Sequence, residues 1–292
     1  MVSIWIHILQ VAFMAMICSG HKSFATKKST EIKHTSFLHH SHYTEQMYRK
    51  QEYLAELYYQ NQIKERAMIK KRRDFYRFSA NYPCFYGVDA LGLDDELSIK
   101  DGHKFTCGLS HINPDPIVYS FGSHRQQDFE LSVLEYRPDA KIHIFEINPA
   151  LLPTNQTGVE RQRRDPRIQY NGYGLGLPGS VNNTKTLTEI MKANNHEYID
   201  ILKMDIEGFE ELWIVREGHK FLPRIGQIAI EFHDVNQNIA MIQIMEKFGF
   251  RVFHNEINIL CTICIEVSLI QRHFVAWNQA KLFFNSTYPT IL

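Results

Sequence analysis

Apolar and polar residues alternate in blocks between residues 116 and 270, and these blocks predict strands and helices in turn. Five short apolar runs are bounded by turn residues, and nearly all are followed by a stretch with helical spacing. The predicted strands are Pro116–Phe121, Lys141–Phe145, Arg167–Tyr170, Ile199–Met204 and Gln227–Phe232. The predicted helices cover about 126–136, 184–194, 209–218 and 235–248.

The last part of this region breaks the alternation. Two further strands, Arg251–Phe253 and Cys261–Leu269, follow each other with no helical run between them. Strands that alternate with helices imply a parallel sheet covered on both faces, whereas a direct connection implies an antiparallel pair. The sequence therefore predicts an α/β, Rossmann-like fold with a seven-stranded, mostly parallel sheet whose last strand is antiparallel.

The residues before the sheet have a different pattern. Residues 21–40 are polar and without period, which is typical of a flexible leader. From Tyr43 to about Arg77 the chain has no Gly or Pro and many helix formers, so we expect one long helix, a stalk or a packing arm. We divide the chain into 1–20, a targeting segment; 21–80, a polar leader and helical stalk; and 81–292, the sheet domain.

The first 20 residues form an apolar run of signal-peptide length. His7 and Gln10 interrupt it, and it is short for a membrane span. We expect a cleaved signal peptide, or alternatively an uncleaved anchor. The protein would then be secreted, or held in the ER or Golgi lumen. Three Asn-x-Thr sequons agree with this route and begin at Asn155, Asn182 and Asn285.

Overall charge gives no reason to expect a charged polymer as partner. The formal net charge is zero and the isoelectric point is about 7.3. We therefore expect no nucleic acid partner, and no membrane contact beyond a possible N-terminal anchor. The oligomeric state stays open.

Four cysteines lie beyond the first segment, and four cysteines allow three pairings. Proximity along the chain favours a disulfide between Cys84 and Cys107, with Cys261 and Cys264 either paired or free. The Cys261–Cys264 spacing is that of a lone CxxC. A zinc site would need two more ligands nearby, and a thioredoxin-like site would need a following helix.

The most informative segment is Ile199–Phe209, where a short apolar run ends in two acids, Asp205 and Glu207. Acidic residues are depleted in strands, so they do not help this strand form. The carboxyl ends of strands in an open α/β sheet are where ligands bind. Residues two apart on a strand point to the same face, so we expect both acids beside a ligand crevice.

Four segments in order, Ile117–Gly122, His143–Glu146, Ile199–Gly208 and Ala229–His233, resemble the FkbM-type methyltransferase domain. The resemblance is closest to its animal branch, the methyltransferase-like protein 24 group, and Asp101–Cys107 resembles that branch just before the first strand. It extends from about residue 84 to about residue 270. It implies a class I methyltransferase fold that uses S-adenosyl-L-methionine (SAM) and commonly methylates oxygen.

On the donor side, the resemblance points to Gly122, Ser123, Glu146 and Asn148 as cofactor-binding residues. Glycine after the first strand allows a tight turn and a close approach to a ligand. A carboxylate at Glu146 can accept hydrogen bonds from ribose hydroxyls. The loop has one glycine where such enzymes usually have more, and an ordinary strand-to-helix turn is the alternative. Asn171–Gly176 imitates a phosphate-binding loop, but we expect a flexible loop near the adenine.

On the acceptor side, we predict Asp205, Glu207 and His233 as catalytic residues. Methylation of a hydroxyl requires removal of its proton, which a carboxylate or a histidine can accept. These groups, with Glu231, could also bind a divalent cation. No dedicated metal motif such as HExxH is present, and we predict no metal centre. Alternatively, Glu207 caps the following helix.

The sequence thus predicts a SAM-dependent methyltransferase that O-methylates a hydroxylated small molecule or a glycan in the secretory pathway. The alternative is a catalytically inactive, methyltransferase-like secreted binding protein, which the single-glycine loop favours. A nucleotide-sugar enzyme is a third option, because Asp205-Ile206-Glu207 imitates an Asp-x-Asp metal motif. The rest of the chain supplies no second half for that motif.

Overall fold

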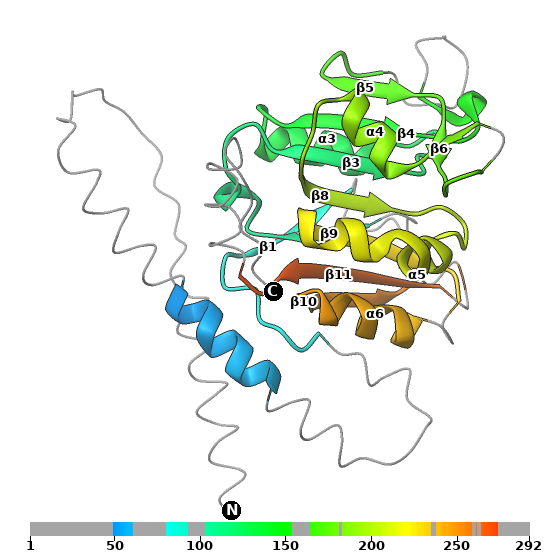
Figure 1. Ribbon diagram of the computed structural model, residues 1–292. Helices are drawn as coiled ribbons and strands as arrows, with labels where there is room; N and C mark the ends of the chain where they lie inside the picture. Colours follow the sequence, from blue (N-terminus) through cyan, green and yellow to red (C-terminus); the bar gives the residue numbers. More distant parts are fainter. Residues whose placement is uncertain are drawn as a thin grey trace, which may run out of the picture. The chain divides into compact units, whose positions relative to one another are not determined.

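The computed structural model describes residues 49–60, 80–92, 103–153, 164–180, 183–234, 238–258, 261 and 264–273. A seven-stranded sheet is its centre, with strand order β10-β11-β9-β8-β3-β4-β5 (Figure 1). The strands are β3 (Ile117–Phe121), β4 (Lys141–Phe145), β5 (Ile168–Asn171), β8 (Ile199–Met204), β9 (Ile225–Phe232), β10 (Phe250–Ile257) and β11 (Ile265–Gln271).

The strand directions confirm the predicted fold class. Strands β5, β4, β3, β8 and β9 are parallel neighbours, and β11 runs antiparallel to both β9 and β10. The start predicted for the last strand, Cys261, is wrong. Cys264 N donates to the Cys261 carbonyl at 3.2 Å rather than to a neighbouring strand, and β11 begins at Ile265.

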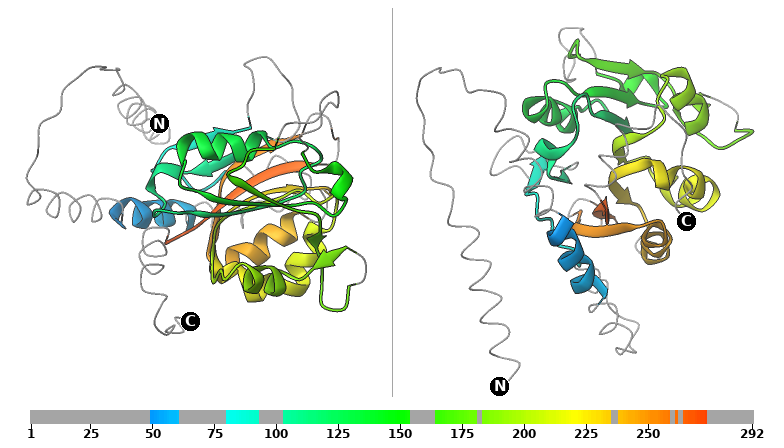
Figure 2. Two further views of the ribbon diagram at one scale, coloured as in Figure 1. Left: turned by 90° about the horizontal axis from the view of Figure 1, so that it is seen from above. Right: turned by 60° about the vertical axis from the view of Figure 1, so that its left-hand side comes forward.

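Helices cover both faces of the sheet, as expected, and two separate cores result (Figure 2). One face packs against α4 (Leu187–Ala193), α5 (Glu210–Phe221) and α6 (Asn238–Lys247). The other face packs against α3 (Asp128–Tyr136) and the segments that precede β3. No helix in the described ranges is long and apolar enough to cross a membrane.

A hairpin of β1 (Val88–Leu91) and β2 (Lys104–Cys107) lies outside the main sheet. Gln227 of β9 holds it through two side-chain hydrogen bonds: Cys107 N donates to Gln227 Oε1 at 2.8 Å, and Gln227 Nε2 donates to the Cys107 carbonyl at 2.7 Å. The favoured Cys84–Cys107 pairing is present, with the Cα atoms 5.8 Å apart. Cys261 and Cys264 are also paired.

The helix of residues 49–60 packs against the same face as the hairpin. Ala55 and Tyr59 are buried in that core, and the Arg251 guanidinium of β10 donates to both carboxylate oxygens of Glu56 at 2.9 Å. The other residues of the long helix predicted for 43–77 lie outside the described ranges. The same holds for the first 20 residues, the leader and the three sequons.

Candidate functional site

Gly122 ends β3 in a conformation that only glycine adopts easily. Its φ is +81°, and a Cβ atom built there would lie 1.7 Å from the carbonyl oxygen of Asp205. The Gly122 N–H donates to the Phe145 carbonyl at 2.9 Å. The single glycine therefore lets three strand ends, those of β3, β4 and β8, approach one another at one point.

Glu146 follows β4 and binds the turn that starts at Gly122. One of its carboxylate oxygens accepts hydrogen bonds from the Ser123 and His124 amides at 3.1 and 3.2 Å, and the other accepts from the Asn148 amide at 3.0 Å. An ionised carboxylate has about four acceptor sites, so about one site stays available to a ligand. Three of the four predicted cofactor-binding residues are thus joined by one carboxylate.

Asn148 has a local role beside its place in the pocket. Its side-chain oxygen accepts from Ala150 N at 3.1 Å and caps the short 3₁₀ helix Pro149–Leu151. This cap fixes the turn after Glu146 on the pocket wall. Within the described residues, the side-chain nitrogen Nδ2 of Asn148 makes no hydrogen bond.

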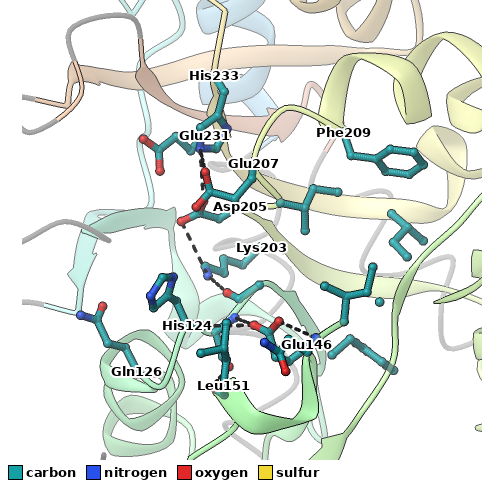
Figure 3. A pocket seen from close by; sticks show the side chains of 18 of the residues that line it. His124, Gln126, Glu146, Leu151, Lys203, Asp205, Glu207, Phe209, Glu231 and His233 are labelled. Atoms are coloured by element: carbon teal, nitrogen blue, oxygen red, sulfur yellow. Dashed lines mark hydrogen bonds and ion pairs between the residues drawn. The ribbon is translucent and has the colours of Figure 1, made fainter. Parts of the chain in front are cut away.

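Asp205 lies directly after β8 and continues the face to which Lys203 points. The Lys203 ammonium donates to the Gly122 carbonyl and lies 3.9 Å from the Asp205 carboxylate (Figure 3). Burial opposes ionisation of Asp205, but Lys203, Lys104 and His233 outweigh it, and the pKa of Asp205 falls below its usual value. Lys203 thereby links the turn at Gly122 to the candidate catalytic acid.

Glu207 and Asp205 converge on His233, as the sequence predicted, although Glu207 does not lie on the strand. Glu207 has a φ of +59°, an uncommon left-handed conformation, and its side chain is 79% exposed. His233 Nε2 lies 3.8 Å from Asp205 Oδ1 and 3.5 Å from Glu207 Oε2. The turn therefore directs an exposed carboxylate back toward the end of β9.

The residue that binds the amides before α5 is Glu210, not Glu207. The Glu210 carboxylate accepts from Ile206 N at 2.6 Å and from Gly208 N at 2.8 Å. It also lies 3.3 Å from His233 Nδ1, and this nearby carboxylate outweighs the burial of His233 and raises its pKa to about 9. His233 is therefore an imidazolium at neutral pH.

The site residues predicted from the sequence line one continuous cavity of about 780 Å³. Glu146 lies toward one end, and Asp205, Glu207, Glu231 and His233 lie toward the other (Figure 3). Ser123 and Asn148, whose backbone amides donate to Glu146, belong to its end, and Gly122 also lines the cavity. Its volume is within the range of about 300–1,000 Å³ that is usual for small-molecule sites. The structure thus brings all seven predicted site residues to the walls of a single pocket.

The segment Asn171–Gly176, which imitates a phosphate-binding loop, also reaches this pocket, but part of it forms a strand. Gly174 and Leu175 form β6, which pairs with β7 (Thr184–Lys185), so the expectation of a flexible loop is wrong there. A Cβ atom at Gly174 would lie 2.8 Å from Ile147 Cβ. Gly174 therefore allows close packing against Ile147, the residue after Glu146.

A set of acids near Asp205 has the oxygen donors that a divalent cation prefers. Ligand atoms of Asp205, Glu231 and Glu266 lie within 4.8 Å of one another. However, the Lys104 ammonium pairs with Glu266 and lies 3.6 Å from Asp205. A protein cation therefore already stands where these carboxylates converge.

Sequence reasoning missed the two lysines and Glu210. Lys203 stands two residues before Asp205, and this spacing on a strand is a usable signal for a shared face. Lys104 belongs to a hairpin whose place beside β11 no local pattern reveals. Glu210 looked like one of several acids at a helix start, because only the fold shows that His233 lies beside it.

Comparisons with known proteins place the chain among methyltransferases. A family model described as a methyltransferase domain matches residues 32–271. No curated protein matches the chain.

Similar solved structures include a fibrillarin pre-rRNA processing protein from Methanococcus jannaschii, with 14% identity over 55% of this chain and 68% of that one, and a TM-score of 0.37. TrmK of M. capricolum, solved in complex with S-adenosyl-homocysteine, is 13% identical over 56% of this chain and 65% of that one, with a TM-score of 0.36. A precorrin-6y C5,15-methyltransferase from Geobacter metallireducens is 11% identical over 56% of this chain and 84% of that one, with a TM-score of 0.35.

Proposed function

Because this chain belongs to the family of methyltransferase domains, with SAM as its methyl donor, we propose that it O-methylates a hydroxylated small molecule or a glycan. The observation that carries the proposal is one pocket with a carboxylate-bound turn at one end and Asp205, Glu207 and His233 at the other. When bound, SAM supplies a methyl group activated by a positively charged sulfur.

The donor end is proposed to be the part around Gly122 and Glu146. The available acceptor site of Glu146 suits a ribose hydroxyl, and charge-assisted hydrogen bonds of this kind are strong. Glu146 also accepts from the Ser123 and His124 amides, so it fixes the turn at this end of the pocket. The residues present therefore fit an adenosine group at this end.

The acceptor end is proposed to be the part around Asp205. The acceptor oxygen would bond to the methyl carbon as that carbon's bond to sulfur breaks, with S-adenosyl-homocysteine as the leaving group. The acceptor O–H bond must also break, and its proton must be taken up. Asp205 is ionised at neutral pH and can accept that proton, whereas the His233 imidazolium cannot. His233 can instead donate a hydrogen bond, and Glu207 can accept one from a neighbouring acceptor hydroxyl. A carboxylate of low pKa suffices, because the oxygen becomes acidic as it is methylated.

We propose that this reaction takes place in the secretory pathway, in a lumen or after secretion. The apolar first segment and the sequons support that route, and so do the two disulfides, since disulfides persist in oxidising compartments. We also propose that the chain belongs to the FkbM-type methyltransferases, in the branch of methyltransferase-like protein 24. The four strand-end segments from Ile117–Gly122 to Ala229–His233 support this. That branch membership would favour oxygen as the methylated atom.

The alternative function is a catalytically inactive, secreted binding protein with the same fold. The single glycine of the donor loop is the observation that favours it. In that case Asp205 and Glu146 would serve only the hydrogen bonds and ion pairs described above.

Calorimetry with SAM and S-adenosyl-homocysteine separates the two functions. We expect heat of binding with wild type and its loss or strong reduction in Glu146→Gln. Transfer of a radiolabelled methyl group is then measured with panels of phenols, monosaccharides and free glycans. Absence of binding heat from folded protein at high concentration would favour the binding-protein alternative.

A further inference from the structure

Two buried carboxyl groups face each other at the acceptor end of the pocket, where Glu231 lines the wall and Glu266 lies behind it. Glu231 of β9 and Glu266 of β11 are directly paired in the strand register, and their exposed fractions are 3% and 5%. Like charges directly opposite on neighbouring strands destabilise a sheet, and burial increases the cost of an uncompensated charge. Asn258 Nδ2 donates to Glu231 Oε1 at 2.7 Å, but this amide carries no charge. The pair therefore needs a cation or a proton between its carboxyl groups.

Lys104 supplies that cation from outside the main sheet. It is the first residue of β2, and its side chain is 1% exposed. Its ammonium pairs with Glu266 and lies 3.6 Å from Asp205 Oδ2, so it joins a buried acid to the candidate catalytic acid.

The hairpin is fixed so that Lys104 points at this cluster. Lys104 and Thr106 are buried and share one face of β2, while the Phe105 ring on the other face stacks on His254 with centroids 3.6 Å apart. The disulfide and the Gln227 amide hold the end of the same strand at Cys107. The position of the ammonium is thus determined by the hairpin and by the contacts that hold the hairpin to β9 and β10.

We propose that Lys104 is a positioning residue, whose ammonium holds Asp205 and Glu266 in place so that the β1–β2 hairpin completes the acceptor end of the site. This inference rests on the proposed function, in which Asp205 accepts the proton of the acceptor. It also gives a role to the Asp101–Cys107 segment, which the donor and acceptor residues leave unused.

The charges around Asp205 determine what loss of Lys104 would do. Lys203 of β8, Lys104 of β2, Glu231 of β9 and His233, which directly follows β9, all face Asp205, with Glu266 of β11 behind them. Burial raises the pKa of Glu266 to about 8, even with Lys104 beside it. Burial works against the Lys104 ammonium, but Glu266 and Asp205 prevail and raise its pKa to about 12. A proton entering the cluster near neutral pH therefore goes to Glu266, and Asp205 stays ionised.

The test is a direct titration of Asp205 that needs no acceptor. Protein labelled with ¹³C at aspartate carboxyls is titrated by NMR, and the Asp205 signal is assigned as the one lost in Asp205→Asn. Removal of an opposite charge at this distance is expected to raise the Asp205 midpoint by about one pH unit in Lys104→Met. Lys104→Arg keeps the charge, so its Asp205 midpoint is expected to stay near the wild-type value. Lys141→Met removes an exposed lysine far from the cluster and serves as the matched control.

An unchanged Asp205 midpoint in folded Lys104→Met would overturn the proposal and leave Lys104 a purely structural role. If that variant does not fold, Lys104→Met/Glu266→Gln, which removes both charges, is compared with Glu266→Gln alone. A higher midpoint in the double variant supports the proposal, and equal midpoints contradict it. SAM binding is measured on the same samples, so failure of the proposed function shows as absence of binding, independently of the titration.

Discussion

Asp205 combines two properties at the scale of a single residue: it faces a pocket, and it stays charged although it is largely enclosed. Lys203 and Lys104 make this possible, because each places an ammonium within 4 Å of its carboxylate. An ionised acid among fixed cations is positioned before any ligand arrives. Asp205 is therefore a stronger candidate for proton acceptance than Glu207, whose side chain is 79% exposed.

Substitution of Asp205 by asparagine tests this difference. We expect Asp205→Asn to lower methyl transfer by roughly 10²–10⁴-fold, the usual contribution of a general base, while SAM binding persists. Glu207→Gln is the matched control and should lower transfer less. Rates are measured with the best acceptor from the panel, and binding by calorimetry. Equal losses in both variants would contradict the assignment of the proton to Asp205.

Gly122 is expected to be irreplaceable for a steric reason. Gly122→Ala adds a Cβ atom 1.7 Å from the Asp205 carbonyl, at a residue with φ of +81°. Backbone strain and overpacking each cost about 1–3 kcal/mol, so we expect a loss of at least ~2 kcal/mol in the free energy of unfolding.

The control for Gly122 is Gly179→Ala. Gly179 has the same φ of +81°, but a Cβ atom there would meet nothing within 4 Å. Urea unfolding of both variants separates the steric clash from the backbone strain. Equal destabilisation would show that strand-end packing at Gly122 contributes nothing.

His233 makes stability depend on pH in a defined window. Glu210 raises its pKa in the folded state to about 9, against a usual value of 6.5. When the pKa of a histidine is higher in the folded state than in the unfolded state, its contribution to stability is complete at pH values below the unfolded-state pKa. This contribution disappears as the pH rises through the folded-state pKa. We expect the free energy of unfolding to fall between about pH 6.5 and 9, and His233→Gln to flatten this part of the profile. His219→Gln, at an exposed residue of α5, should keep the wild-type slope.

At the scale of elements, the sequence predicted what depends on local pattern. Two strands, Lys141–Phe145 and Ile199–Met204, were placed at their observed bounds because turn residues flank a dense apolar run. The start of β11 was misplaced because Cys261-Thr-Ile-Cys264 has strand-forming composition, whereas a hydrogen bond and a disulfide join Cys261 directly to Cys264. A strand pattern therefore fails where a covalent link competes with it.

The residues of the candidate site also differ in whether a local sequence pattern reveals them. Strand-end acids and the glycine turn were predictable, since they stand at element boundaries that the apolar pattern defines. Lys104 was not, because its partners Asp205 and Glu266 are more than 100 residues away along the chain and only the sheet order brings them together. Pairings of this kind require the tertiary fold.

The two disulfides are expected to contribute differently to stability. Cys84–Cys107 spans 23 residues and Cys261–Cys264 spans three. Loop-closure entropy predicts a loss of about 3 kcal/mol for Cys84→Ser/Cys107→Ser and about 2 kcal/mol for Cys261→Ser/Cys264→Ser. Urea unfolding of each double variant measures both. Because the first disulfide holds the hairpin, its loss should also raise the Asp205 midpoint, which the second double variant should leave nearer wild type.

At the scale of the whole molecule, the open question is where the folded domain begins. We predicted a boundary at residue 81 on composition, with the preceding helix as a stalk or packing arm. The helix of residues 49–60 shares a core with α3 and the hairpin, and the family match begins at residue 32. Its burial is one-sided: Tyr59 is 2% exposed and stacks under the Arg251 guanidinium, whereas Tyr53 is 64% exposed.

These two tyrosines test whether the helix belongs to the domain. Tyr59→Ala removes a buried aromatic ring and is expected to cost about 3–5 kcal/mol of unfolding free energy, because large core truncations leave a cavity. Tyr53→Ala alters the same helix by the same atoms at an exposed position, so we expect a change within about 0.5 kcal/mol. A single cooperative urea transition in both variants, with only Tyr59→Ala shifted, would place the helix inside the cooperative unit. If Tyr59→Ala unfolds at the wild-type midpoint, the helix does not stabilise the sheet domain, and the boundary near residue 81 stands.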